Sequence, residues 1–340
     1  MKKVAVAILN WNGKKLLEKF LPSVIENTPE EIADVYVIDN NSSDGSISFL
    51  KEKFPELKII ELDKNYGYAG GYNKGLKKID AKYVALINSD IEVTKGWLEP
   101  LVETLEKHSN AVAVQPKILW LKDKNKFEYA GASGGFLDKH YYSFCRGRIG
   151  NVLEQDNGQY DNEMEVFWAS GAAFLVDKKI FEQVGGFDEY FFAHMEEIDL
   201  AWRLKARGYK IFVNPASVVY HLGGASLDAS SPYKTFLNFR NSIVMIYKNK
   251  KRVFPFLIIR LLIDTGLAFL FLFKFRFKHF IAVVKAHCQS YVCMYKHREN
   301  RKENLAMTKV WSFDEIYPRS ILWQYVVKGI KKFSELDWKK

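Results

Sequence analysis

Cysteine is scarce in this sequence, with only three in 340 residues and no CxxC pair. Cys145, Cys288 and Cys293 give no even disulfide framework, which excludes a disulfide-stabilised scaffold and fits a reducing compartment. A signal peptide of the usual form is also lacking, because the apolar run at residues 4–9 is short and alternates like a strand. We interpret that run as the first strand of a folded domain.

Several catalytic and nucleotide-binding signatures are absent as well. The glycines of LDKNYGYAGGYNKG (62–75) match neither GxGxxG nor a P-loop, and they follow the third expected strand instead of the first. They still permit close backbone approach at a helix start, where N–H groups meet an anion, although a plain glycine-rich turn is the alternative. No Ser/His/Asp or Cys/His arrangement points to a covalent intermediate.

The charge is unevenly distributed along the chain. The net charge is +10, yet residues 241–340 hold 20 Lys and Arg against 7 Asp and Glu. The first 240 residues hold 30 against 33 and are slightly acidic. This asymmetry predicts an acidic partner for the C-terminal part, either nucleic acid or an anionic membrane surface.

The first half alternates apolar, β-branched runs with helical patterns. Strands are expected at 4–9, 35–39, 58–62, 83–87 and 111–115, and helices at 16–27, 45–54, 69–79 and 97–107. Such βαβ units predict an α/β fold with a buried, mostly parallel sheet that is flanked by helices. The hydrophobic fraction of 48% is sufficient for a sizeable core.

Asp or Asn follows each of the first four expected strands. These residues are Asn10 and Asn12, Asp39 and Asn40, Asp63 and Asn65, and Asn88 and Asp90. Turn chemistry alone explains some of them. Because ligands of such sheets bind beyond the carboxyl ends of the strands, the repetition predicts a binding edge.

The middle of the chain is less regular. Residues 121–163 read as a polar excursion over that edge, and 165–176 as a strand or strand pair broken at Gly171. A helix is expected from 195 to 207, followed by strands at 210–213 and 217–221.

The C-terminal part from residue 231 is basic, apolar and helical in pattern. Residues 254–273 are long enough to cross a bilayer, but Arg260 and Asp264 interrupt them on one helix face. A helix in the membrane interface, a tilted spanning helix and a buried helix of a soluble domain all remain open. Nucleic acid is disfavoured because the basic residues accompany an apolar run.

Three carboxylates crowd into AHMEEIDLAWR (193–203). Glu196, Glu197 and Asp199 stand at an expected helix start, where free N–H groups and the helix dipole offset part of their repulsion. Asp199 can pair with Arg203 at i+4, while Glu197 projects from a different face. A solvated charge run is the alternative interpretation.

Taken together, these motifs resemble glycosyltransferase family 2. The resemblance rests on Asn10, VIDNNSSDGS, NYGYAGGYNKG, NSD and GGFDEYFFAHMEEIDLAWRLKARGY, in the family's order over residues 3–226. It implies a GT-A fold in residues 1–230, and the basic, apolar pattern of 231–340 predicts a membrane-associated helical region there. It also implies sugar transfer from a nucleoside diphosphate with inversion, most similar to rhamnosyltransferases of bacterial polysaccharide pathways.

The resemblance implies a nucleotide site at the sheet edge. Asp39 would accept from the N3–H of uracil or thymine, with Asn10 near the same base. The remaining residues expected at this site are Asp44, Asn65, Gly67, Asn73 and Asn88.

A divalent cation, Mg²⁺ or Mn²⁺, is implied by the same resemblance. Asp90 would bind it as the last residue of the family's DxD motif, and His221 would complete the site. Asn88 replaces the first Asp of that motif, which predicts weaker cation binding. A strand-end turn and a packed histidine are the alternatives.

For catalysis, the resemblance implies that Glu197 is the general base, where the family commonly has Asp. Glu196 is the alternative base, and Asp199 completes the predicted catalytic cluster. Trp168, Ser170 and Gly171 are expected to border the acceptor, with core packing as the alternative.

The function expected is transfer of a sugar from dTDP-rhamnose or a UDP-sugar to a glycan acceptor, such as one on a polyprenyl diphosphate. The enzyme is expected at the cytoplasmic face of a bacterial membrane, bound to its anionic surface and not to nucleic acid. A sugar nucleotidyltransferase and a non-catalytic scaffold on a degenerate GT-A fold are the alternatives.

Overall fold

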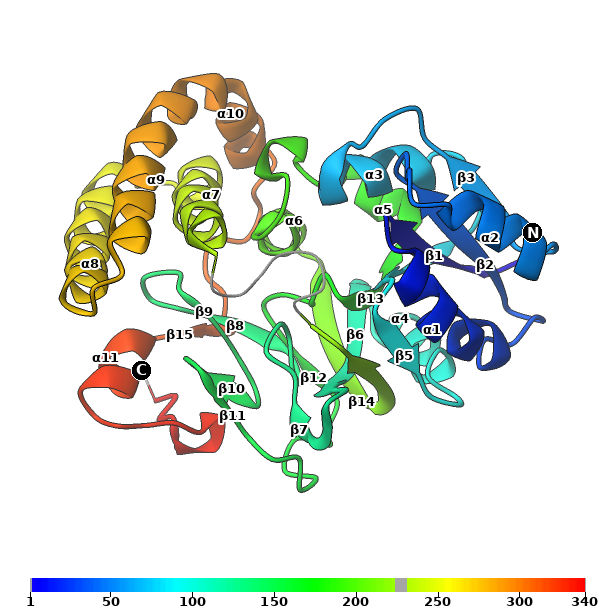
Figure 1. The fold of residues 1–340 in the computed structure, drawn as a ribbon. Helices are drawn as coiled ribbons and strands as arrows, with labels where there is room; N and C mark the ends of the chain where they lie inside the picture. Colours follow the sequence, from blue (N-terminus) through cyan, green and yellow to red (C-terminus); the bar gives the residue numbers. More distant parts are fainter. Residues whose placement is uncertain (1, 224–230, 340) are drawn as a thin grey trace.

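The computed structural model describes residues 2–223 and 231–339. The boundary predicted at residue 230 lies outside these described residues. A large mixed sheet occupies one half of the molecule, and helices from the C-terminal part lie at the other end (Figure 1).

The first half alternates strands and helices as predicted. Its elements are β1 (Val4–Asn10), α1 (Lys14–Glu26), β2 (Ala33–Asp39), α2 (Ser46–Lys53), β3 (Lys58–Glu61), α3 (Gly67–Leu76), β4 (Tyr83–Asn88), β5 (Ile91–Val93), α4 (Glu99–Lys107) and β6 (Ala111–Trp120). The second half adds β7 (Asp123–Phe127), β12 (Met164–Glu165), β13 (Ala173–Asp177), α5 (Lys178–Gln183), α6 (Glu196–Ala206) and β14 (Lys210–His221). The two strands expected at 210–213 and 217–221 form one strand with a bulge between Asn214 and Val218.

The strand order is β12-β14-β6-β13-β4-β1-β2-β3. Strands β4, β1, β2 and β3 are parallel, but β13 runs antiparallel between β4 and β6. The sheet is therefore more mixed than predicted, because the chain enters β13 from the carboxyl edge after a long excursion.

Helices cover both faces of the sheet. Val4, Val6 and Ile8 of β1 pack with α1 and α4, whereas Ala5 and Ala7 face the side of α3 and α6. This alternation follows from the two-residue period of a strand and explains the continuous apolar sequence.

The excursion at 121–163 contains more structure than the sequence indicated. It forms most of a second sheet, in the order β11 (Val152–Leu153), β10 (Arg148–Ile149), β9 (Ser143–Cys145), β8 (Gly135–Asp138) and β15 (Ile316–Tyr317). Strand β15 comes from the C-terminal part and pairs in parallel with β8. Strands of two to four residues leave too short a pattern to be predicted from alternation.

The C-terminal part consists mainly of α7 (Pro232–Asn249), α8 (Phe254–Phe273), α9 (Phe277–Lys296) and α10 (Arg298–Ala306). Helix α11 (Ile321–Val326) and the short helix η2 (Phe333–Glu335) follow them. A second short helix, η1 (Glu189–Phe191), precedes α6. Helix α7 lies between α6 and the α8–α9 pair (Figure 1).

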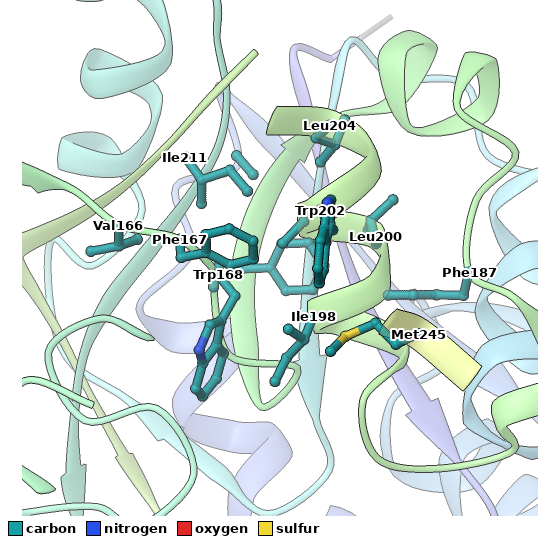
Figure 2. Packing of buried hydrophobic residues seen from close by; sticks show 14 of the residues in the cluster. Val166, Phe167, Trp168, Phe187, Ile198, Leu200, Trp202, Leu204, Ile211 and Met245 are labelled. Carbon is teal, nitrogen blue, oxygen red and sulfur yellow. The ribbon is translucent and has the colours of Figure 1, made fainter. Parts of the chain in front are cut away.

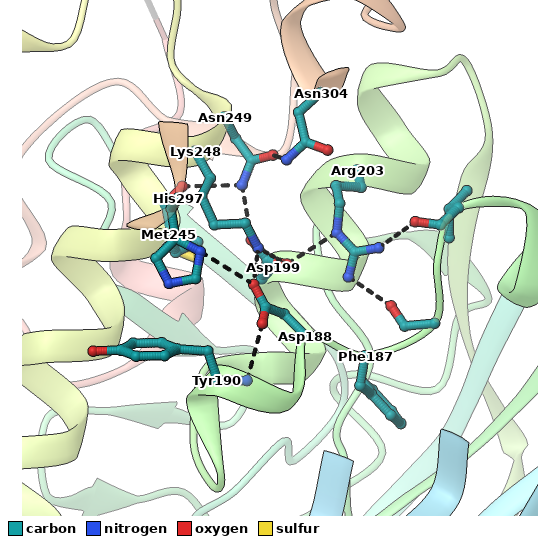
Figure 3. Close-up of polar contacts among 12 residues, drawn as sticks. Phe187, Asp188, Tyr190, Asp199, Arg203, Met245, Lys248, Asn249, His297 and Asn304 are labelled. Atoms are coloured by element: carbon teal, nitrogen blue, oxygen red, sulfur yellow. Dashed lines mark hydrogen bonds and ion pairs between the residues drawn. The ribbon is translucent and has the colours of Figure 1, made fainter. Parts of the chain in front are cut away.

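A buried ion-pair network joins α7 to α6 (Figure 3). The Asp199 carboxylate accepts from Arg203 Nε at 2.9 Å, from Lys248 Nζ at 2.9 Å and from Asn249 Nδ2 at 2.9 Å. Lys248 also contacts Asp188 at 2.7 Å. Burial would raise the pKa of Asp199, but the charges of Lys248 and Arg203 outweigh it and hold that pKa below its usual range.

We predict that Lys248→Met lowers the free energy of unfolding by about 3 kcal/mol, because it leaves a buried carboxylate incompletely paired. Urea denaturation followed by circular dichroism measures this change. The control is Lys302→Met, which removes an exposed pair with Glu299 and should change stability by less than about 0.5 kcal/mol. Equal effects of the two variants would contradict a stabilising role for the network.

Candidate active site

Asn10 and Asp39 meet at the carboxyl edge of the sheet, as predicted. They end β1 and β2 and are direct neighbours in the strand register. Asn10 Nδ2 donates to Asp39 Oδ1 at 3.0 Å, and the Ser42 N–H donates to Asp39 Oδ2 at 2.8 Å. Both side chains are buried, so the carboxylate is held in a fixed orientation.

The loop before α3 lies at the same edge. Asn65 Oδ1 accepts from the Gly67 N–H at 2.8 Å and from Asn40 Nδ2 at 2.9 Å. Asn40 Oδ1 accepts from the Tyr66 N–H at 2.9 Å. Gly67 has φ +70°, and an added Cβ would lie 2.9 Å from the Phe192 ring. Asn40, one of the strand-end residues expected at this edge, therefore organises this loop.

Two of the residues expected to bind nucleotide have other partners. Asp44 accepts from the Lys14 N–H at 2.8 Å and from the Ser46 N–H at 3.1 Å, which connects the starts of α1 and α2. Asn73 exchanges two hydrogen bonds with the backbone of Phe187, at 2.8 and 2.9 Å. These contacts give Asp44 and Asn73 structural roles at this edge, and their expected part in forming the nucleotide cleft stays a prediction.

Asp90 and His221 come together beside the end of β4. His221 Nε2 lies 3.1 Å from Asp90 Oδ1, and its Nδ1 lies 3.3 Å from Glu128 Oε1. Burial would lower the pKa of His221, but hydrogen bonds to the two carboxylates raise it to about 10. Glu128 was missed because it belongs to the excursion, whose sequence carries no site pattern.

This pair fits part of a cation site. In residues 2–223 and 231–339, no group of three or more His, Cys, Asp or Glu side chains is arranged to hold a metal ion alone. Asp90 and His221 provide one carboxylate and one imidazole at the edge where Asn88 ends β4, and the imidazole must lose its proton to bind a cation. An incomplete protein ligand set suits a divalent cation that also binds phosphate oxygens.

Glu196 and Glu197 begin α6, where their environments differ. Glu196 is buried, and burial together with the neighbouring Glu197 raises its pKa well above the usual range. Glu197 is half-buried, and burial raises its pKa to about 7. One oxygen of each carboxyl has no hydrogen-bond partner among the described residues.

Glu197 lies close to the edge that carries Asn88. An added Cβ on Gly171 would lie 3.1 Å from Tyr68 Oη and 3.9 Å from Glu197 Cβ. Tyr68 Oη donates to the Gly171 carbonyl at 2.6 Å, and the Asn88 N–H donates to the next carbonyl, of Ala172, at 2.9 Å. Tyr68 is thus a further site residue, inside the glycine-rich motif that the sequence analysis singled out.

The segment before α6 has an unusual backbone. Phe192, His194 and Met195 all have positive φ, at 63°, 67° and 73°. Asn241 of α7 fixes this segment, because its Nδ2 donates to the carbonyls of Phe191, Ala193 and His194 at 3.1, 3.0 and 2.8 Å. The position of Glu197 therefore depends on α7, whose Asn241 lies 47 residues after His194.

Asp199 does not share the site of the two glutamates. Its oxygens are occupied by Arg203, Lys248 and Asn249, so the catalytic role that we predicted for it is wrong (Figure 3). The predicted i, i+4 pair with Arg203 is confirmed.

Of the three residues expected at the acceptor, only Gly171 lies beside Glu197. Trp168 is buried among the apolar side chains that surround Trp202 and Ile198 (Figure 2), and its Nε1 donates to the Phe136 carbonyl at 3.0 Å. Ser170 is buried and donates to the Ala130 carbonyl. Trp168 and Ser170 are core residues, which corrects our prediction for both.

Comparison with known families gives a match to Glycosyl transferase family 2 over residues 5–185, more than half of the chain. Among curated proteins, the chain is 28% identical over 240 residues to an N-acetylglucosaminyl-diphospho-decaprenol L-rhamnosyltransferase of Mycobacterium tuberculosis, covering 64% of this chain and 75% of that protein. It is 25% identical over 247 residues to the low-salt glycan biosynthesis hexosyltransferase Agl10 of Haloferax volcanii, covering 70% and 73%.

Solved structures support the GT-A fold. GalNAc-T7 with UDP, GalNAc and Mn²⁺ superposes with a TM-score of 0.57 at 17% identity, over 74% of this chain and 49% of that chain. The mannosyltransferase PcManGT of Pyrobaculum calidifontis, with GDP-Man and Mn²⁺, gives 0.51 at 15% identity, over 89% and 74%. The fold class that the sequence predicted is confirmed.

We predict that Asn241→Leu loosens the start of α6 and lowers the free energy of unfolding by about 2 kcal/mol, because it leaves carbonyls without donors. Urea denaturation measures the loss, and hydrogen exchange of peptides covering 191–197 should accelerate. Asn125→Leu, at an exposed position of β7, is the control. Unchanged exchange in Asn241→Leu would contradict the positioning role.

Proposed function

This chain belongs to glycosyl transferase family 2 and is a glycosyltransferase; from that premise we propose an inverting transfer from a pyrimidine nucleoside diphosphate sugar to a lipid-linked glycan. The observation that carries this proposal is the placement of Glu197. Its half-buried carboxyl has an oxygen without a partner among the described residues, and it lies beside the edge that holds Asn88 and Asp90.

For the donor, we place the nucleobase at Asp39. A carboxylate fixed by Asn10 and Ser42 suits the N3–H of uracil or thymine, which a purine does not present in the same way. The diphosphate would lie towards Asp90 and His221. A divalent cation, Mg²⁺ or Mn²⁺, held by Asp90 and His221 would neutralise the diphosphate charge.

For catalysis, Glu197 accepts the proton of the acceptor hydroxyl. The hydroxyl oxygen attacks the anomeric carbon from the face opposite the nucleoside diphosphate, which leaves with the electron pair of the broken bond. A pKa of about 7 lets this carboxyl be ionised in part of the molecules and still bind a proton effectively at neutral pH. Burial and the neighbouring Glu197 carboxyl also raise the pKa of Glu196.

For the acceptor, the name of the mycobacterial relative supplies the chemical class. That protein is named for a sugar carried on a decaprenyl diphosphate. We propose a polyprenyl diphosphate-linked glycan as acceptor and dTDP-rhamnose or a UDP-sugar as donor, in cell-surface polysaccharide synthesis. The acceptor sugar would approach Glu197 beside Gly171, where a side chain would press on Tyr68 Oη.

Thermal unfolding with nucleotides tests the donor site. We expect UDP or dTDP with Mn²⁺ to raise the melting temperature, since a ligand at 100 times its Kd stabilises the folded state by about 2.7 kcal/mol. Asp39→Ala and Asp90→Ala should lose the shift. Asp34→Ala, at the opposite end of β2, should retain it. If no pyrimidine diphosphate shifted the wild-type protein at millimolar concentration, the donor assignment would be wrong.

The pH profile tests the base. Because the pKa of Glu197 is raised, the basic carboxylate forms as pH rises through about 7, so kcat should increase across that range and fall below it. Glu197→Gln should lower kcat by about 10²–10⁴-fold and retain the nucleotide-induced thermal shift. A larger loss in Glu196→Gln than in Glu197→Gln would transfer the role to Glu196.

A further inference from the structure

Helices α8 and α9 form a hairpin with an apolar outer face. Figure 1 shows the two helices side by side at the edge of the molecule, connected by a short turn. Leu262, Phe273 and Val292 are 69%, 76% and 68% exposed, and Phe269 and Ile281 are also exposed. An apolar hollow of about 370 Å³ lies between the helices. Water is a poor environment for a continuous face of this kind.

The polar residues of α8 point the other way, into the protein. Arg260 and Asp264 are almost fully buried. Arg260 donates to the His140 carbonyl at 2.9 Å, and Asp264 accepts from Tyr142 and lies 3.0 Å from His287 Nε2. His140 and Tyr142 belong to the β8–β9 turn, so the catalytic half of the protein is attached to the middle of α8.

This attachment decides how α8 can meet a membrane. The helix is long and apolar enough to cross a bilayer, with only 28% of its most apolar window buried. If it crossed, the β8–β9 turn at its midpoint would enter the hydrocarbon with irregular backbone, which lipid cannot satisfy. A helix lying in the plane of the interface keeps that turn on the aqueous side.

Cations stand at both ends of α8. Lys250, Lys251 and Arg252 precede it, and Lys274, Arg276 and Lys278 follow it in the hairpin turn and at the start of α9. In the described ranges none of the six forms an ion pair with a carboxylate. Basic residues flanking an apolar face match the headgroups of an anionic leaflet.

We propose that the outer face of the α8–α9 hairpin docks flat on an anionic bilayer and does not cross it. The aromatic and aliphatic side chains enter the upper acyl region, and the five exposed cations contact lipid phosphates. Lys250 is not one of them, because its Nζ donates to Tyr141 Oη at 3.0 Å. The docking proposal rests on the proposed function only because a lipid-linked acceptor would lie in the same membrane. The docking geometry is argued from the contacts and exposure of the hairpin.

Vesicle co-sedimentation of the full chain tests docking. Binding to phosphatidylcholine vesicles with 30% phosphatidylglycerol should exceed binding to phosphatidylcholine alone and fall with added salt. Leu262→Glu and Phe273→Glu should each lower partitioning by about tenfold. Val326→Glu, at a comparably exposed apolar position on α11, is the matched control and should bind like the wild type. Equal loss in all three variants would overturn the assignment to this face.

Labelling at the turn distinguishes lying from crossing. The Lys274→Cys variant, made in a Cys288→Ser background, is bound to preformed vesicles. A membrane-impermeant maleimide is then added to label Cys at position 274. Prompt labelling without detergent is expected, because the turn stays on the outer side. Protection that only detergent removes would mean that the hairpin crosses, and would overturn the proposal.

Two further comparisons distinguish membrane docking from dimerisation through the same face and from failure of the proposed donor site. If the outer face instead joins two copies of the chain, Leu262→Glu converts a lipid-free dimer to a monomer in light scattering, and docking is wrong. Glu197→Gln should dock like the wild type. Loss of docking with an intact nucleotide shift refutes only the membrane face, whereas docking without any nucleotide shift refutes only the donor site.

Discussion

The buried carboxylate of Asp199 is the interaction on which the rest of the structure depends. It sits in α6, two residues after the proposed base, and binds Lys248 and Asn249 of α7. Helix α7 in turn packs on α9 and, through Asn241, holds the backbone that leads into Glu196. A buried charge tolerates little displacement of its partners. The catalytic helix and the apolar hairpin therefore form one mechanical unit.

That unit also explains why two unpaired glutamates are tolerated nearby. Burying Glu196 and Glu197 without counter-ions is unfavourable, and the raised pKa of each is the direct expression of that penalty. Helix N–H groups offset part of it. The segment before them, with positive φ at Phe192, His194 and Met195, adds strain that the surrounding contacts must overcome. The contacts of the Asp199 network thus offset the free-energy cost of burying two unpaired glutamates at the proposed active site.

The same logic applies to the membrane face. Arg260 and Asp264 interrupt an apolar helix, and their sequence pattern is equally compatible with spanning, lying on or avoiding a bilayer. Contact with Tyr142 and the backbone of His140 fixes which side of α8 faces protein, and we propose that the opposite side lies on a bilayer. An enzyme docked in this way meets a lipid-linked glycan from the aqueous side, with Glu197 rigidly connected to the docking surface.

The sequence alone determined the alternating α/β half and its binding edge, because strands and helices report their own periodicity and the ends of parallel strands must meet. Asn10, Asp39 and Asp90 were found in this way. Tertiary structure alone showed that Lys248 and Asn249 occupy Asp199, and it placed Trp168 in the core. It also paired Ile316 of β15 with β8. The reason is physical: whether a polar or aromatic side chain packs, pairs or reacts depends on residues distant in sequence, which local pattern does not encode.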